Sequence, residues 1–484
     1  MQLKDPSLLT GQSYVNGAWI DGDSGKKFAV TNPANGDIVA ECADCGEDET
    51  RRAIDAAYAA QKGYARLTAA DRASMLMTLY NLMVANIDDL ATILTLEMGK
   101  PWAEARGEIM YGASFVKWYA EEAPRIYGDT IPAPATNKRL VVIKQAIGVV
   151  AAITPWNFPN AMIARKIAPA LAVGCTVVVK PAKQTPLSAF AMAVLAERAG
   201  FPQGVFNVVC GTSASKIGAE MCANPKVRKL TFTGSTEVGR VLMQQCAKDI
   251  KKLGLELGGN APFIVFDDAN LDEAVMGALG SKFRNAGQTC ICANRIYVQD
   301  SVYDEFARKL ADKVGELLVG DPFSASTSIG PMIDQNGVDK AQAHVDDALA
   351  KGAKVLFGGF EHALGGTFFT PTVLTGVTQD MKVSKEETFG PVAPLFRFHT
   401  EDEVIGYAND TEFGLAAYFY SRDIGRCWRV AEELEYGIVG VNDGMPSNAA
   451  APFGGWKASG LGREGSKYGA EDFLEIKYIS MGGI

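Results

Sequence analysis

The chain has 484 residues, of which 48% are hydrophobic and 21% charged, and its formal net charge is −9 at pH 7. One hydrophobic core seldom supports a chain of this length, so we expect two or three lobes. The negative charge argues against nucleic acid as a partner, and the longest uncharged apolar stretch, residues 167–179, is too short to span a bilayer.

The N-terminal residues lack a basic segment followed by an apolar one, which indicates no signal peptide and favours a cytoplasmic enzyme. Asn16-Gly17, between β-forming residues, predicts a hairpin. Residues 50–122 are rich in Ala, Leu and Met and predict helices. Residues 130–144 are β-like, and their two prolines suit an edge strand or a projection from the body.

Strand-like and helix-like segments alternate from residue 148 to residue 257. The strand-like runs are 148–153, 176–179 and 205–209, and the clearest helix is 187–199. Continuous apolar strands separated by helices are typical of a parallel, doubly wound sheet. Such a sheet binds ligands beyond the carboxyl ends of its strands.

A second alternating series runs from residue 261 to residue 441. We expect strands at 261–266 and 295–299, a helix over 271–282 and another from Ser301 to about 318. Asn270 is expected to cap the first of these helices. Two α/β lobes would then meet near Gly258-Gly259. The tail, residues 472–479, alternates like a half-exposed strand and needs a partner edge from its own chain or another subunit.

The nine cysteines are an odd number, which fits reduced thiols better than a disulfide framework. Cys42 and Cys45 form a C-x-x-C, but no second pair stands at zinc spacing and the chain has only three histidines. We therefore expect no metal site there and interpret the pair as part of an acidic surface turn.

Cys290 follows a helix-like segment, in a Gly-Gln-Thr context that predicts an exposed loop. A presented thiolate is a strong nucleophile, although a small buried packing residue is the commoner role of a cysteine. Cys292 is open to two interpretations as well. It is either a packing residue or the partner of Cys290 in a strained, easily reduced disulfide.

Three further positions suggest chemistry. Glu256 lies between two leucines, which would raise its pKa as a general base requires, although an outward-facing strand glutamate is an equal alternative. Gly234-Ser235 follows a strand-like segment and opens a helix whose N-terminus could hold a pyrophosphate, despite the absence of G-x-G-x-x-G. Lys180 ends a strand and faces the expected ligand crevice.

Several motifs, in order, resemble the aldehyde dehydrogenase superfamily over essentially the whole chain. They are TPWNFP at 154–159, KP at 180–181, FTGS at 232–235, LELGGN at 255–260, GQTC at 287–290, EETFGP at 386–391 and PFGG at 452–455. Residues 283–295, and Ser447-Asn448 before 451–455, are similar to the bacterial succinate-semialdehyde dehydrogenases within it.

The resemblance implies two Rossmann-like α/β lobes with parallel-sheet cores and a small β oligomerisation arm. The implied parts are a nucleotide-binding domain at 1–125 and 145–257, an arm at 126–144 and 470–484, and a catalytic domain at 258–469. A homodimer or homotetramer follows by the same resemblance. The arm would explain the unpaired strand edges expected above.

The resemblance also implies a mechanism. Cys290 would attack the aldehyde, the Asn157 side chain and the Cys290 backbone N–H would stabilise the oxyanion, and Glu256 would activate the water that hydrolyses the thioester. The cofactor-binding positions would be Thr154, Trp156, Lys180, Ala182, Lys183, Gly234, Ser235, Leu257, Glu387 and Phe389. At Lys183 many relatives carry a glutamate that repels a 2′-phosphate, so we expect NADP, with NAD possible.

For the substrate, the resemblance points to a small anionic aldehyde held by Arg165, Arg284 and Ser447. Succinate semialdehyde is the expected one, and glutarate semialdehyde or a sulfonated aldehyde such as sulfolactaldehyde is the alternative. Residues 442–450 and Trp456 depart from the expected succinate-semialdehyde pattern, which leaves these choices open.

Other classes have less support. A non-enzymatic relative of the same fold would be expected to lack Cys290 or Glu256, and this chain has both. No histidine lies near the motifs, which disfavours a Cys–His protease, and no G-x-S-x-G elbow indicates a serine hydrolase.

Overall fold

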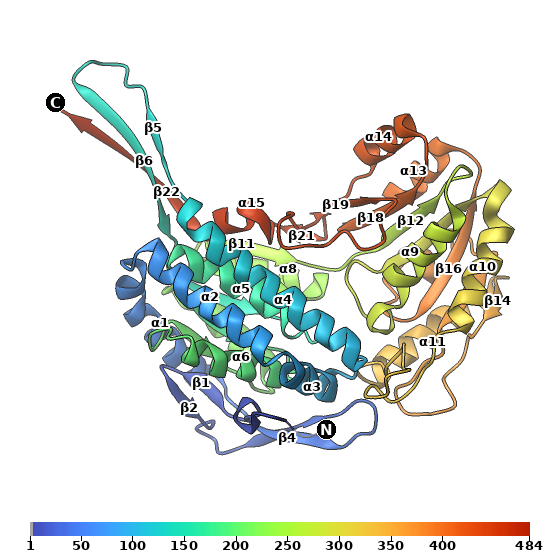
Figure 1. Ribbon diagram of the computed structural model, residues 1–484, viewed down its shortest axis with the longest axis horizontal. Coiled ribbons are helices and arrows are strands. Elements are labelled where there is room, and N and C mark those ends of the chain that lie inside the picture. Colours follow the sequence, from blue (N-terminus) through green and yellow to red (C-terminus); the bar gives the residue numbers. More distant parts are fainter. Residues whose placement is uncertain (1–2) are drawn as a thin grey trace.

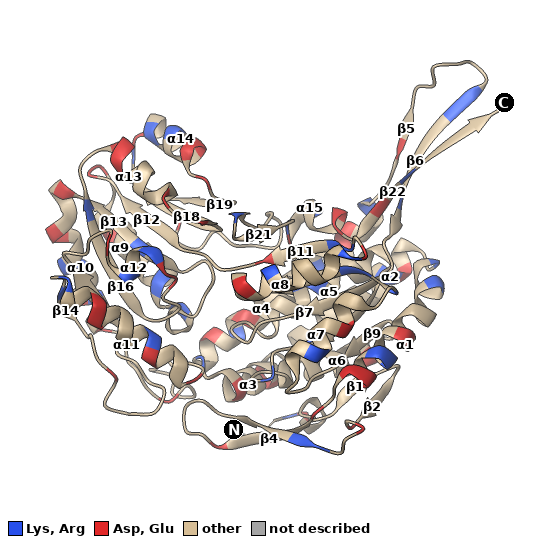
Figure 2. Cartoon of the chain, turned by 180° about the vertical axis from the view of Figure 1, so that it is seen from behind, with Lys and Arg blue, Asp and Glu red and all other residues tan. Residues whose placement is uncertain are grey.

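The computed structural model describes residues 3–484. Figure 1 shows two α/β bodies side by side and a narrow β ribbon that projects from the first of them. Each body is built on one large, mainly parallel sheet with helices packed against it. This architecture confirms the predicted fold class. Figure 2 shows that basic and acidic residues are interspersed on the outer helices.

The first sheet has eight strands. In spatial order they are β2 (Ala18–Ile20), β1 (Ser13–Val15), β9 (Phe206–Val208), β8 (Thr176–Lys180), β7 (Val149–Ile153), β10 (Val227–Thr233), β11 (Lys252–Glu256) and β21 (Gly460–Leu461). The five strands from β9 to β11 are parallel. Every residue of β7 and β8 is buried, which explains why both read as unbroken apolar runs.

Eight helices belong to this part of the chain. They are α1 (Glu47–Ala65), α2 (Ala69–Ala85), α3 (Ile87–Met98), α4 (Trp102–Glu122), α5 (Ala161–Val173), α6 (Leu187–Arg198), α7 (Ala214–Ala223) and α8 (Thr236–Ala247). The predicted helical region is thus four helices, and the Asn16-Gly17 hairpin is confirmed by positive φ angles at both residues. Helix α4 packs on α2 and α5, which brings its inner face close to the segment that follows β7.

The second sheet has seven strands. In spatial order they are β14 (Lys354–Phe357), β15 (Thr372–Thr375), β16 (Val392–Phe398), β13 (Ala293–Gln299), β12 (Ala261–Val265), β18 (Ala416–Tyr420) and β19 (Ile438–Val441). All neighbouring pairs are parallel except β14 with β15. The chain therefore crosses from one sheet to the other between Glu256 and Ala261.

Helices flank this sheet as well. They are α9 (Leu271–Phe283), α10 (Tyr303–Gly315), α11 (Gln335–Ala350), α12 (Lys382–Lys385), α13 (Glu401–Asn409) and α14 (Ile424–Glu433). Two local predictions need correction. Asn270 precedes α9, but its side chain makes no capping hydrogen bond with the described residues. The helix expected from Ser301 starts at Tyr303, because a 3-10 turn takes up residues 300–302.

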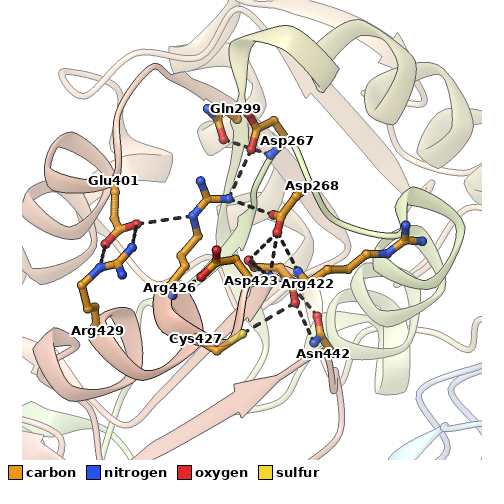
Figure 3. Close-up of polar contacts among 11 residues, drawn as sticks. Asp267, Asp268, Gln299, Glu401, Arg422, Asp423, Arg426, Cys427, Arg429 and Asn442 are labelled. Atoms are coloured by element: carbon orange, nitrogen blue, oxygen red, sulfur yellow. Dashed lines mark hydrogen bonds and ion pairs between the residues drawn. The ribbon is translucent and has the colours of Figure 1, made fainter.

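A polar network fixes α14 to the end of the second sheet (Figure 3). Asp268 accepts hydrogen bonds from the Ser421 hydroxyl at 2.9 Å and from the backbone N–H groups of Arg422 and Asp423 at 2.8 and 2.9 Å. Arg426 donates to the same carboxylate at 2.8 Å. The strand end and the helix start are thus joined by one side chain.

The projecting ribbon is a third sheet of three antiparallel strands, β22 (Leu474–Gly482), β6 (Lys138–Ala146) and β5 (Asp129–Ile131). Only Leu474 of β22 is buried, so the half-exposed pattern expected of the tail is wrong for this single chain. The smaller elements are a β3 (Lys27–Thr31) and β4 (Ile38–Ala43) ribbon, a β17 (Phe413–Gly414) and β20 (Trp456–Lys457) pair, and α15 (Ser466–Glu471).

The interpretation of Cys42 and Cys45 as a surface turn is wrong. Both are buried, Cys42 lies in β4, and the Cys45 thiol donates to the Ser13 hydroxyl at 3.3 Å. The acidic neighbours misled because a strand end can bury alternate residues. Within residues 3–484 we find no His, Cys, Asp and Glu group arranged to hold a metal ion, and none of the helices has the length and apolar character to cross a membrane.

Candidate active site

Cys290 lies in the loop between α9 and β13, and this loop is bent by an unusual turn. Asn285, Ala286 and Gly287 have φ angles of 53°, 52° and 75°, all left-handed. Left-handed backbone costs about 1–2 kcal/mol for each residue other than glycine, so surrounding contacts must hold it. The loop is buried rather than exposed as expected, and Cys290 itself is only partly accessible.

Contacts from three directions hold the turn. The Asn285 N–H donates to Glu104 Oε2 of α4 at 2.9 Å. Gln288 is fully buried, and its amide donates to the Asn285 carbonyl at 3.1 Å and accepts from the Ile333 N–H at 2.9 Å. At Gly287 a Cβ would lie 2.2 Å from the Gly390 carbonyl oxygen, so only glycine fits.

Asn157 is positioned from the other side, just beyond β7. Its Nδ2 donates to the Gln288 carbonyl at 3.0 Å, and its own carbonyl accepts from Lys100 Nζ at 2.8 Å. Lys100 forms a buried ion pair of 2.5 Å with Glu108, which also accepts from the Asn160 N–H at 2.9 Å. A buried pair of this kind needs such additional hydrogen bonds.

Our sequence reasoning missed Lys100, Glu104 and Glu108. Their spacing of four residues was a usable signal, because it aligns side chains along one face of a helix. The fact that this face is buried depends on tertiary packing.

Two cavities meet at Cys290. The larger, of about 360 Å³, is lined by the predicted residues Trp156, Asn157, Gly234, Ser235, Leu257, Glu387 and Phe389. The smaller, of about 140 Å³, is lined by the predicted residues Arg165, Arg284 and Ser447. Cys290, Phe158 and Met162 line both. A nucleophile is thus placed where two ligands can approach from different sides.

The larger cavity opens at the carboxyl ends of the first sheet, as expected for a nucleotide site. Thr154 follows β7 and its N–H donates to the carbonyl of Lys180, which ends β8, at 3.1 Å. Lys180, Ala182 and Lys183 lie outside the larger cavity along the same edge, as does Thr154. Lys180 is buried, and this burial lowers its pKa, whereas Lys183 is exposed.

The features of this edge fit a dinucleotide. Ser235 is the N-cap of α8, where free backbone N–H groups favour a phosphate. At Gly234 a Cβ would come within 2.4 Å of the Phe232 ring, which keeps the approach to that helix free of side chains.

Glu387 and two aromatic rings lie closer to Cys290. The Glu387 carboxylate accepts from the Gly259 N–H at 3.3 Å, and burial raises the pKa of Glu387 to about 7. Trp156 and Phe389 meet edge to face, with ring centroids 5.6 Å apart. A buried carboxylate between apolar rings is suited to accept hydrogen bonds from sugar hydroxyls.

The smaller cavity contains two guanidinium groups. Arg165 is almost fully buried, with Nε 2.8 Å from Glu464 Oε2, and its guanidinium stacks 3.8 Å from the centre of the Phe453 ring. Its Nη2 is buried and makes no hydrogen bond with any described residue. Arg284 lies 5.3 Å from the centre of the Phe158 ring and has no carboxylate partner within residues 3–484. Both can therefore receive an anion.

Ser447 closes this cavity together with a residue that we did not predict. Its Oγ lies 2.5 Å from the Tyr111 hydroxyl of α4. Two adjacent hydroxyls beside the arginines add donors for an anion at the end of the cavity remote from Cys290.

Burial dominates the electrostatics of Cys290 and Glu256. It raises the pKa of the Cys290 thiol to about 12, against the opposing effects of Arg165 and Arg284. It also raises the pKa of Glu256 well above its usual range, and Glu464 raises it further. Glu256 lines neither of the two cavities but a third one behind them, so the structure does not bring its carboxyl into the space around Cys290.

Cys292 is buried, and its thiol donates to the Lys282 carbonyl at 3.2 Å. This contact favours the packing interpretation, and both Cys290 and Cys292 are free thiols.

Comparison with known proteins agrees with this geometry. Residues 19–479 match the Aldehyde dehydrogenase family. The chain belongs to that family. Glu256 and Cys290 lie within the matched region, as do the residues that line the two cavities.

Three curated relatives of this aldehyde dehydrogenase span it almost end to end. It is 63% identical over 482 residues to the NADP(+)-dependent succinate-semialdehyde dehydrogenase GabD of Escherichia coli (strain K12), covering 100% of both chains. It is 62% identical over 484 residues to a glutarate-semialdehyde dehydrogenase of Pseudomonas aeruginosa, again covering 100% of both. It is 61% identical over 484 residues to a 3-sulfolactaldehyde dehydrogenase of Pseudomonas putida, covering 100% of this chain and 99% of that one.

The dehydrogenase also resembles a solved structure closely. The crystal structure of an Escherichia coli NADP-dependent enzyme superposes with a TM-score of 0.99 at 63% identity, covering 99% of this chain and 100% of that one.

The exposure of the cysteines makes a direct prediction about thiol reactivity. The other eight are buried, so iodoacetamide should alkylate Cys290 first. Because the pKa of this thiol is about 12, its thiolate fraction and hence the alkylation rate should rise about tenfold per pH unit from about pH 7 to about pH 9. Peptide mass spectrometry measures the rate, with Cys290→Ala as the control. A rate that stays flat over this range would show that the thiol is already ionised at neutral pH.

Proposed function

We propose that this aldehyde dehydrogenase oxidises succinate semialdehyde to succinate with NADP, and that it can also use NAD. The observation that carries the proposal is the convergence of Arg165 and Arg284 on a small cavity that ends at Cys290. A cavity of about 140 Å³ suits a short chain, and two guanidinium groups suit a carboxylate at its far end. The identity of 63% to an NADP(+)-dependent succinate-semialdehyde dehydrogenase supports the same substrate and cofactor.

Cys290 acts as the nucleophile. Because burial disfavours its thiolate, the proton must leave before attack, and a cation bound in the larger cavity would favour this ionisation. The thiolate then attacks the aldehyde carbon. Asn157 donates one N–H of its amide to the Gln288 carbonyl, which leaves the second N–H for the oxyanion, together with the Cys290 backbone N–H.

Trp156, Ser235 and Glu387 would hold NAD(P) in the larger cavity, where it supplies a hydride acceptor. Loss of the hydride from the substrate carbon leaves a thioester on Cys290. Glu256 then activates the hydrolytic water, for which its side chain turns from the rear cavity towards Cys290. The raised pKa of Glu256 suits a group that accepts a proton near neutral pH.

The remaining cofactor positions would lie along the edge of the first sheet. Thr154, Lys180, Ala182 and Lys183 would face the adenosine half, with Gly234 and Leu257 beside the helix of Ser235. Lys183 is exposed and forms no ion pair with the described residues, so its ammonium group is free to meet a 2′-phosphate.

Glutarate semialdehyde and sulfolactaldehyde are the second candidates. Met445 lines the small cavity and is 56% exposed, so the wall opposite the arginines can adapt to a longer or bulkier anion. Relatives at 62% and 61% identity carry these substrates in their names.

We also propose a homodimer or homotetramer and retain the division into three parts given above. Strand β22 exposes Ile476 and Tyr478, and both β5 and β22 are edges of the projecting sheet. Strand β19 is a free edge of the second sheet. Apolar side chains on a free edge favour pairing with another subunit.

Two substitutions test the chemical roles. Cys290→Ala should abolish turnover, because no thioester can form. Glu256→Gln should retain a burst of reduced cofactor of about one equivalent and lose steady-state turnover by about a hundredfold or more, because hydrolysis is slowed. Stopped-flow absorbance of the reduced cofactor measures both. Substantial steady-state turnover by Cys290→Ala would overturn the assignment of the nucleophile.

The anion site is tested with Arg284→Ala. Losing a charge-assisted hydrogen bond should cost about 1.5–3 kcal/mol, or roughly ten- to a hundredfold in kcat/KM, for succinate semialdehyde. The loss for butyraldehyde, which has no distal anion, should be much smaller. Arg284→Lys keeps the charge without the fork and should fall between. Equal losses on the two aldehydes would mean that Arg284 supports the fold and binds no anion.

Cofactor choice is tested with Lys183→Glu. The new carboxylate should repel a 2′-phosphate and lower the ratio of NADP to NAD kcat/KM by about tenfold or more. Lys354→Glu, an equal charge change on exposed β14 of the other sheet, is the control and should leave the ratio unchanged. An unchanged ratio in Lys183→Glu would remove Lys183 from the cofactor site.

A further inference from the structure

Aldehyde oxidation by water releases protons that must leave a closed site. The aldehyde carbon loses a hydride to NAD(P), water adds to the thioester carbon, the sulfur of Cys290 leaves, and a carboxylic acid forms. Two protons are released in all, one taken from water by Glu256 and one lost when the product acid ionises. When cofactor and acyl group fill the two cavities at Cys290, Glu256 needs another route to solvent. This reasoning rests on the proposed function.

The third cavity offers that route. It has a volume of about 10 Å³ and lies between Glu256 on one side and Lys229 and Asp472 on the other. This is near the lower limit for one water molecule, and its walls are polar enough to bind it. Glu256 Oε2 is buried and has no hydrogen-bond partner among the residues that the structure describes, as expected of a group that meets water there.

The outer wall of this cavity leads to the surface. Lys229 Nζ lies 3.3 Å from Asp472 Oδ2, and the exposed fractions of the two side chains are 1% and 32%. Lys229 is thus entirely inside, while Asp472 contacts both the buried ammonium group and solvent. Gly254 keeps the space open, because a Cβ there would lie 3.1 Å from Lys229 Nζ and 3.6 Å from Thr231 Oγ1.

The other charged groups around Glu256 are engaged. Glu464 pairs with Lys166 and, at 2.8 Å, with Arg165, both on α5. Although burial opposes ionisation, these two cations hold the pKa of Glu464 below its usual range. Arg463 donates to the carbonyls of Gly455 and Gly462. A carboxylate held by two cations is a poor proton acceptor, which leaves the partly exposed Asp472 as the better one.

We infer that the rear cavity is the proton outlet of Glu256. The protonated carboxyl of Glu256 donates to one enclosed water, this water passes a proton to the Asp472 carboxylate, and Asp472 releases it to solvent. Lys229 acts as a positioning residue that orients Asp472 and the water. The outlet serves hydrolysis only, because hydride transfer does not load Glu256.

Two variants test the outlet by different means. Asp472→Asn removes the acceptor, and Gly254→Ala fills the water space while leaving the Lys229–Asp472 pair intact. Both should retain the burst of reduced cofactor, lose about tenfold in steady-state rate and show a larger solvent deuterium isotope effect on that rate. The loss stays below the roughly hundredfold expected of a group in contact with the reacting atoms.

Glu471→Gln is the matched control, because Glu471 precedes Asp472, is exposed and does not line the cavity. It should behave as the wild type. A second readout needs no cofactor. Reaction with 4-nitrophenyl acetate acylates Cys290 with a burst of nitrophenolate, and the slow phase that follows reports Glu256-assisted deacylation. In both variants only the slow phase should fall.

The inference is overturned if Asp472→Asn and Gly254→Ala match the control in steady-state rate and isotope effect, or if burst and steady state fall together. If instead Glu256→Gln itself keeps full steady-state turnover, the proposed function of Glu256 fails and the outlet fails with it. The two failures are thereby distinguishable.

Discussion

The left-handed turn at residues 285–287 is the constraint on which the site depends. It aims Cys290 at the junction of two cavities, and it is held in place by Glu104 of the first body and by Gln288 within the loop. The same α4 helix carries Glu108, which through Lys100 fixes Asn157. One helix of the nucleotide-binding side therefore positions both the nucleophile of the other sheet and the group next to it. The relative placement of the two bodies and the chemistry at Cys290 are coupled.

Charge is distributed around the site in a way that separates three tasks. The side of the small cavity has two guanidinium groups, the larger cavity has the Glu387 carboxylate, and the rear cavity has the carboxyl of Glu256. Desolvation raises the pKa of both carboxyls and of the Cys290 thiol. Such a site holds its groups neutral at rest and ionises them when charged ligands enter, which limits side reactions of a free thiolate.

Much of this could be predicted from the sequence. Strands buried on both faces, such as β7 and β8, produce continuous apolar runs, and the motifs around Glu256 and Cys290 are specific. The left-handed Ala286 could not be predicted, because alanine carries no signal for that conformation and long-range contacts impose it. The burial of Cys42 and the Lys100–Glu108 pair likewise depend on which surfaces pack together. Local sequence does not encode these contacts.

The central claim is that Cys290 carries the substrate covalently, between the anion site and the cofactor site. The most direct measurement is the intact and peptide mass of Glu256→Gln mixed with succinate semialdehyde and NADP and quenched in acid. The account predicts a succinyl thioester on the peptide that contains Cys290, formed only when the cofactor is present. An unmodified Cys290 peptide after a full burst of reduced cofactor, or a succinyl group on another residue, would contradict it.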